Sequence, residues 1–204
     1  MGIKEANDKL VILGGGGHAA SVMSAILDKQ RIVGVLDNPK DDSKIDELLR
    51  NGLQYFHVAI GDNTIRQKKT EECIRKGLSP ITIIDKTAAI DSEAVIGQGC
   101  FIGKNAVVNA RVVIGQNCII NSGAIIEHDC KVMDNTHCAP GSVLCGNVSV
   151  GRSCLIGANA TIIPGVKIVD HVTVGAGSVV TDDLEMAGTY VGSPAKLLAK
   201  KESR

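Results

Sequence analysis

The sequence predicts an α/β N-terminal unit of the half-Rossmann type over residues 1–86, followed by an all-β parallel β-helix over residues 87–204. Two local patterns and the composition support this fold class. An unbroken six-residue repeat occupies the second half, and a glycine-rich turn joins a strand-like run to a helix-like run near the start. The chain has 23 Gly and only 2% aromatic residues, which is typical of many short strands and tight corners.

The first unit opens with a buried strand over residues 9–14. A run of four glycines then leads through His18 into a helix-like stretch over residues 19–30, and a second strand covers 31–37. A strand, a glycine turn and a helix N-terminus together form an anion site. A third strand over 57–61, a helix over 64–77 and a last strand over 80–85 complete the unit.

The glycine turn also fits a dinucleotide fingerprint. Gly15, Gly17 and Ala20 match G-x-G-x-x-A, and Asp37 lies at the distance expected for a ribose-binding acid. A complete dinucleotide fold needs two βαβαβ halves, however, and only about 85 residues precede the repeat. The unit therefore has room for a mononucleotide.

From Ile90 onward an aliphatic residue recurs at every sixth position without interruption. Fifteen of the sixteen residues in this series are Ile, Val or Leu, and the exception is Cys138. A second, mostly small series follows four positions later in each hexad. An α-helix would need a period of 3.6 and a strand a period of 2, so the repeat predicts stacked coils that bury one continuous core.

The same register accounts for most of the cysteines. Five of the seven fall in one of the two inward series, where they are predicted to pack as small hydrophobic residues. The sequence contains no CxxC pair, and we expect no metal.

Composition excludes several function classes. Lys+Arg and Asp+Glu are both 22, so no basic surface is predicted for nucleic acid. No apolar run approaches membrane-spanning length, and no secretory signal is recognised, so no membrane partner is expected. Seven cysteines without an export signal favour the cytoplasm.

Several motifs together resemble the bacterial sugar acetyltransferases of the PglD/NeuD group, which belong to the hexapeptide-repeat acyltransferases. They are GGGGH, VLD, AIGDN followed by IR, the hexads, EHD and a terminal VGSPAK. The resemblance covers nearly the whole chain. It implies a left-handed β-helix, a homotrimer with acetyl-CoA between neighbouring helices, and a nucleotide-sugar acceptor.

His128 is the predicted general base. It occupies an outward corner position of its hexad and has a carboxylate on each side, Glu127 and Asp129. A carboxylate holds the imidazole in the required tautomer and stabilises the imidazolium. In the resembling family the residue after the histidine has this role, so we expect Asp129 to orient His128, although family members often have Glu at that position.

The resemblance assigns the remaining site residues. For the acceptor nucleotide sugar they are Gly16, Gly17, His18, Asp37 and Gly61. For acetyl-CoA they are His137 near the thioester, Gly146 with its backbone N–H at the oxyanion, and Ala158, Ala176, Pro194 and Lys196 along the rest of the donor.

The sequence is compatible with four functions. The leading one is N-acetylation of a 4-amino-4,6-dideoxy sugar on UDP, or of a GDP-linked relative. The alternatives are a sialic acid O-acetyltransferase, a non-enzymatic β-helix scaffold and an NAD-dependent enzyme. A scaffold needs neither the EHD motif nor the glycine loop, and the half-sized first unit argues against NAD.

Overall fold

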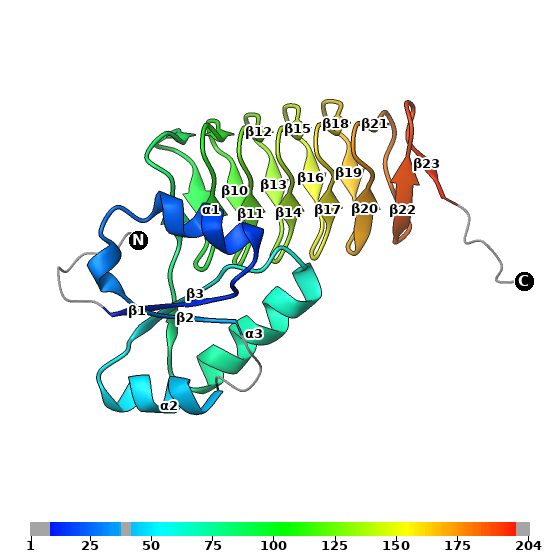
Figure 1. The fold of residues 1–204 in the computed structure, drawn as a ribbon. Coiled ribbons are helices and arrows are strands. Elements are labelled where there is room, and N and C mark those ends of the chain that lie inside the picture. The colour runs from blue at the N-terminus through cyan, green and yellow to red at the C-terminus, as the bar shows by residue number, and fades with distance from the viewer. Residues whose placement is uncertain (1–8, 38–41, 199–204) are drawn as a thin grey trace, which may run out of the picture.

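The computed structural model describes residues 9–37 and 42–198. A row of parallel coils forms the long axis of the molecule, and a small α/β unit lies beneath its first coils (Figure 1). Strand β23 (Lys196–Leu197) lies at the far end of the row from that unit. The α/β unit followed by a left-handed β-helix confirms the predicted fold class.

The first unit contains a four-stranded parallel sheet in the order β2-β1-β3-β4. All four residues of β1 are buried, as expected for the strand at the centre of the fold. The strands are β1 (Leu10–Leu13), β2 (Ile32–Leu36), β3 (Tyr55–Val58) and β4 (Ser79–Pro80). The helices are α1 (Gly17–Ala25), the 3-10 turn η1 (Lys29–Arg31), α2 (Asp42–Arg50) and α3 (Asn63–Arg75).

Two features of this unit differ from the sequence prediction. Helix α2 was not predicted. The strand expected over residues 80–85 is divided, because β4 pairs with β3 whereas β5 (Ile83–Ile84) pairs with Phe101–Ile102 of the β-helix. Strand pairing therefore passes from one unit to the other between Pro80 and Ile83, and the division at residues 86 and 87 stays a prediction.

The β-helix has three faces, which we name by their numbers of strands. The eight-stranded face contains β5, β8 (Phe101–Ile102), β11 (Ile119–Ile120), β14 (His137–Cys138), β17 (Leu155–Ile156), β20 (Val172–Val174), β22 (Gly188–Val191) and β23 (Lys196–Leu197). The six-stranded face contains β6 (Ala89–Ile90), β9 (Val107–Val108), β12 (Ile125–Ile126), β15 (Val143–Leu144), β18 (Thr161–Ile162) and β21 (Val179–Val180). The five-stranded face contains β7 (Val95–Ile96), β10 (Val113–Ile114), β13 (Lys131–Val132), β16 (Ser149–Val150) and β19 (Lys167–Ile168).

One coil contains 18 residues, so residues i and i+18 lie one above the other. The pairing is parallel throughout the three faces except between β22 and β23, which close the end of the helix as an antiparallel pair. Many corner residues have a positive φ, which explains the frequent Asn and Gly at those positions.

The aliphatic series fills the coil centre as predicted, and Ile102, Ile120, Ile126, Leu144 and Ile156 are all fully buried. The cysteines do more than pack. The thiols of Cys100, Cys118 and Cys154 donate to corner carbonyls at 3.0–3.2 Å, and the hydroxyl of Thr136 makes the equivalent bond at 2.7 Å. The three cysteines are therefore weak hydrogen-bond donors as well as small hydrophobic groups.

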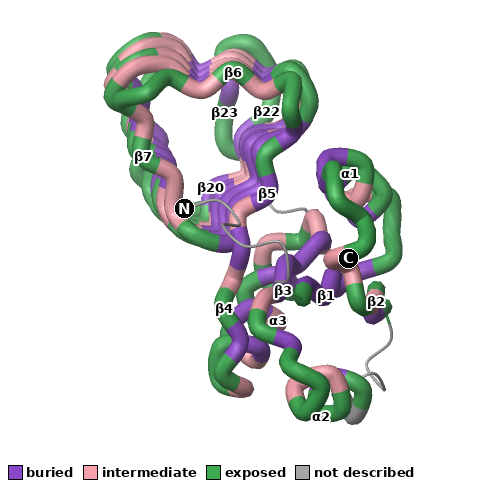
Figure 2. The backbone as a smooth tube through the Cα atoms, turned by 90° about the vertical axis from the view of Figure 1, so that its left-hand side faces the viewer, coloured by how far each residue is buried: buried purple, intermediate pink, exposed green. Residues whose placement is uncertain are grey.

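The three faces have different surroundings. The first unit covers the early strands of the eight-stranded face, where Phe101 and Ile119 share a buried cluster with Leu10 and Val22 (Figure 2). The outward strand residues of the six-stranded face are uncharged along its whole length. They are Ala89, Val107, Ile125, Val143, Thr161 and Val179.

Candidate active site

His128 lies at the corner between the six-stranded and five-stranded faces, in the turn from β12 to β13. The buried Ile126 and Cys130 fix the backbone on either side of it, and its side chain is 58% exposed. Asp129 follows with φ of 61°, the left-handed corner conformation. The hexad repeat therefore directs the imidazole outward from a rigid backbone, as predicted.

The structure brings His128 and Asp129 together. Nδ1–H of His128 donates to Oδ2 of Asp129 at 2.8 Å, which leaves Nε2 as the basic nitrogen. Asp129 also accepts two hydrogen bonds from Arg111, at 2.7 Å from Nε and 2.9 Å from Nη2. The Arg111 guanidinium, and then His128, hold the pKa of Asp129 well below its usual range, so the carboxylate is ionised.

Gly146 lies one coil above His128 and close to its ring. A Cβ built on Gly146 would be 2.7 Å from both Cε1 and Nε2 of His128. The amides of Cys145 and Asn147 donate to carbonyls within the stack, whereas the Gly146 amide has no acceptor among the described residues. An N–H without an acceptor and a basic nitrogen therefore belong to the same corner, and acyl transfer uses groups of both kinds.

The predicted acceptor residues lie at the start of α1. Gly16 is the N-cap residue and makes no side-chain cap bond, and a Cβ at Gly16 or Gly17 would meet nothing within 4 Å. Asp37 accepts from the Gly15 amide at 2.7 Å and so holds the turn in place. This exposed turn presents free N–H groups and the positive end of the helix dipole to an anion.

His18 and His137 meet where the two units join, with ring centroids 6.4 Å apart. Burial and the charge of Arg66 lower the pKa of each to about 4, so both rings are neutral. Nε2 of His137 accepts from the Asn121 amide at 3.2 Å, and a backbone hydrogen bond joins the ring to Gly61.

His137 is on the eight-stranded face, half a coil from His128. The structure therefore groups it with His18 and Gly61, two of the residues predicted for the acceptor. Its predicted contact with the donor stays untested.

The junction depends on Arg66, whose role the sequence did not predict. The residue is 1% exposed, and its guanidinium donates only to neutral oxygens. These belong to Ile60, Gly61, Asn63, Asn117 and Asn135, at distances of 2.7–3.2 Å. Arg66 thus ties α3 and the loop at Gly61 to two successive coil corners.

The predicted donor residues follow a different edge of the β-helix. Ala158 and Ala176 lie one coil apart at the corner between the eight-stranded and six-stranded faces, and Pro194 precedes Ala195, whose amide donates to Val179 at 2.7 Å. Lys196 is exposed on β23. The six-stranded face separates this edge from Gly146, so one chain carries the two halves of the predicted donor site on opposite edges.

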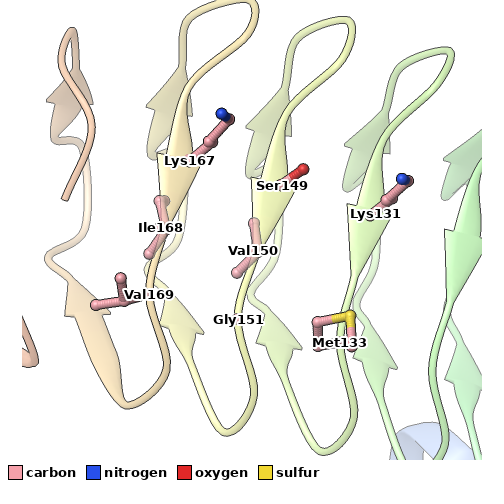
Figure 3. Close-up of a pocket in the computed structure, with 8 residues that line it drawn as sticks. All are labelled: Lys131, Met133, Ser149, Val150, Gly151, Lys167, Ile168 and Val169. Atoms are coloured by element: carbon pink, nitrogen blue, oxygen red, sulfur yellow. The ribbon is translucent and has the colours of Figure 1, made fainter. Parts of the chain in front are cut away.

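A shallow cavity of about 290 Å³ lies on the outside of the five-stranded face (Figure 3). Lys131, Ser149 and Lys167 line one side of it, and Met133, Gly151 and Val169 line the other. None of the residues predicted for the site lines this cavity.

Comparison with known proteins gives three family matches along the chain. Residues 9–73 match the PglD N-terminal domain, residues 93–128 match the bacterial transferase hexapeptide (six repeats), and residues 147–182 match the hexapeptide repeat of succinyl-transferase.

The chain is also 34% identical to a histidine variant of perosamine N-acetyltransferase from Caulobacter crescentus, whose structure contains CoA and GDP-perosamine. That similarity covers 96% of this chain and 99% of the other, with a TM-score of 0.86. The chain belongs to the hexapeptide-repeat sugar acetyltransferases of the PglD group.

Other members of this family support the assignment. The acetyltransferase domain of PglB from Neisseria gonorrhoeae, in complex with acetyl coenzyme A, is 29% identical over 95% of this chain and all of that one, with a TM-score of 0.86. GDP-perosamine N-acetyltransferase of Escherichia coli O157:H7 is 31% identical over 89 residues, which are 44% of this chain and 40% of that relative.

The described residues contain no group of three or more His, Cys, Asp or Glu side chains placed to hold a metal ion. None of their helices has the length and apolar character needed to span a membrane.

Proposed function

We propose that the chain transfers the acetyl group of acetyl-CoA to the amino group of a nucleotide-linked amino sugar, with His128 as general base. The observation that carries the proposal is the corner where the basic nitrogen of His128 lies against Gly146 while Asp129 holds the other ring nitrogen. The CoA-bound relatives support acetyl-CoA as the donor.

The reaction follows from this geometry. The sugar amine attacks the thioester carbonyl, and Nε2 of His128 takes the proton that the nitrogen loses as the C–N bond forms. The oxyanion of the tetrahedral intermediate accepts a hydrogen bond from the Gly146 N–H. As the C–S bond breaks, His128 returns the proton to the CoA sulfur, and Asp129 stabilises the imidazolium in between.

For the acceptor we propose a nucleoside diphosphate amino sugar, bound with its diphosphate at the N-terminus of α1. Gly16 and Gly17 would face the phosphates, and His18, Asp37 and Gly61 would line the remainder. GDP-perosamine is the first candidate, because the relatives in Caulobacter and Escherichia are named for it. UDP-linked 4-amino sugars are the second.

For assembly we propose a homotrimer packed through the six-stranded face. Its uncharged outward residues would meet copies of themselves around a threefold axis. The donor-site edge with Ala158 and Ala176 would then approach the His128 corner of a neighbouring chain, which would complete a site that one chain leaves divided. We also propose a cytoplasmic location, since no disulfide joins the described cysteines.

A panel of substrates tests the function. Acetyl-CoA would be incubated with GDP-perosamine, UDP-4-amino-4,6-dideoxy sugars and sialic acid, and mass spectrometry would detect an added acetyl group. His128→Ala should lower kcat by about 10²–10⁴-fold and leave acetyl-CoA binding intact. A folded variant that keeps more than about a tenth of wild-type kcat would exclude His128 as the base. Acetylation of sialic acid alone would favour the O-acetyltransferase.

A further inference from the structure

The Arg111 guanidinium contacts the Asp129 carboxylate, which in turn accepts from His128. Arg111 occupies the same corner as Asp129 one coil earlier, with φ of 58° beside the 61° of Asp129. The 18-residue coil therefore stacks the two side chains, and both guanidinium–carboxylate bonds are short, at 2.7 and 2.9 Å. This bidentate geometry fixes the carboxylate in direction as well as position.

We propose that Arg111 is a positioning residue for the acetyl transfer, which acts on His128 through Asp129. The inference rests on His128 being the general base. Arg111, Asp129 and His128 form a continuous chain of hydrogen bonds that ends at the basic nitrogen beside Gly146.

Arg111 has two effects in this arrangement. Its bidentate contact holds the Asp129 carboxylate in one orientation, in which Oδ2 accepts the hydrogen bond from Nδ1–H of His128. Its charge also lowers the pKa of Asp129, so the carboxylate stays ionised and accepts the hydrogen bond from Nδ1–H of His128.

The charged surroundings of His128 are uneven. The coil before His128 contains Arg111. One coil before Arg111 lie Glu93, whose Oε2 is 3.7 Å from the Arg111 guanidinium, and Asp91. The coil after His128 presents the uncharged Gly146 and Asn147. The remaining charged residues around this corner are Glu127, Asp129 and Lys131. Removal of Arg111 therefore takes away the cation held against Asp129.

The experiment compares kcat and KM for the wild type, Arg111→Met, Arg111→Lys and Arg152→Met, with GDP-perosamine and acetyl-CoA as substrates and with CoA release as the signal. Arg152 is the matched control, because its side chain also approaches an acid 18 residues away, Asp134, at 3.7 Å. Circular dichroism would show that each variant is folded.

Arg111→Met should lower kcat about three- to tenfold and leave KM for both substrates within about twofold, because Arg111 orients the base and does not contact substrate. Arg111→Lys keeps the charge and loses the bidentate contact, so its kcat should lie between those of Arg111→Met and the wild type. Arg152→Met should match the wild type in both respects.

Equal kcat in Arg111→Met and Arg152→Met, or a loss in Arg111→Met that appears only in KM, would overturn the positioning role. His128→Ala in the same series separates this failure from that of the proposed function. If His128→Ala stays active, the general base is wrong. If His128→Ala is inactive while Arg111→Met is normal, only the role of Arg111 is wrong.

Discussion

Replacement of Gly146 by Ala is the most informative single change at the proposed catalytic corner, where Gly146 lies against the ring of His128. The new Cβ would lie 2.7 Å from Cε1 and Nε2 of His128, whereas ordinary contacts begin at 3.4 Å. The ring must therefore retreat by at least 0.7 Å. The backbone conformation at this corner accommodates a Cβ, because the equivalent positions are Ala110 two coils earlier and Pro164 one coil later.

The expected loss follows from this displacement. Nδ1 of His128 is tied to Asp129 at 2.8 Å, so the ring can move only by weakening that bond or by turning Nε2 away from Gly146. A misplacement of about 1 Å at a reacting group costs on the order of 10²-fold in rate, or about 2.7 kcal/mol in the activation barrier. Because the ring is exposed and lies outside the core, the free energy of unfolding should change by less than about 1 kcal/mol.

The assay is a double-mutant cycle on kcat for Gly146→Ala and His128→Ala, with urea melts to confirm stability. Since the clash is with the His128 ring, Gly146→Ala should cost less than about twofold when His128 is already Ala. Wild-type kcat in Gly146→Ala would refute the reasoning. A hundredfold loss that persists without His128 would place the role of Gly146 elsewhere, at the oxyanion or in the fold.

Three further predictions concern orientation, the junction and pH. Asp129→Asn should lower kcat by about tenfold or more but less than His128→Ala does, and equal losses in steady-state kinetics would contradict an orienting role. Arg66→Met should lower the free energy of unfolding by more than about 3 kcal/mol, since several buried oxygens lose their donor. A change of less than about 1 kcal/mol in urea melts would contradict this. Burial lowers the pKa of His57 from 6.5 to about 4, so its contribution to stability should fall by about 2 kcal/mol between pH 7 and 5, and His57→Gln should remove that share of the pH dependence in urea melts while His18 and His137 keep theirs.

Much of the catalytic corner follows from the hexad register. Ile126 and Cys130 belong to the inward series, which places His128 outward, and three hexads per turn place Gly146 directly above it. Hydrophobic periodicity is strong here because every coil contributes to one buried core.

The parts that were missed depend on contacts between distant segments. Arg66 lies in a helix, where an arginine is normally predicted to be solvent-exposed, and its burial arises only when α3 docks on the corners at Asn117 and Asn135. The pairing of Arg111 with Asp129 needs the coil length and the rotamers of both side chains. The grouping of His137 with His18 likewise depends on how the first unit covers the eight-stranded face, which periodicity does not encode.

The central claim is that His128 acts as general base in N-acetylation of a nucleotide-linked amino sugar. The most direct measurement is the product formed from GDP-perosamine and acetyl-CoA, identified by mass spectrometry and by NMR of the acetylated nitrogen, with wild-type protein and His128→Ala compared side by side. We predict that the wild type yields the N-acetyl sugar and free CoA in equal amounts, and that His128→Ala is slower by about 10²–10⁴-fold. Absence of N-acetyl product from GDP-perosamine and from the UDP-linked 4-amino sugars, or equal rates for the two proteins, would contradict the account.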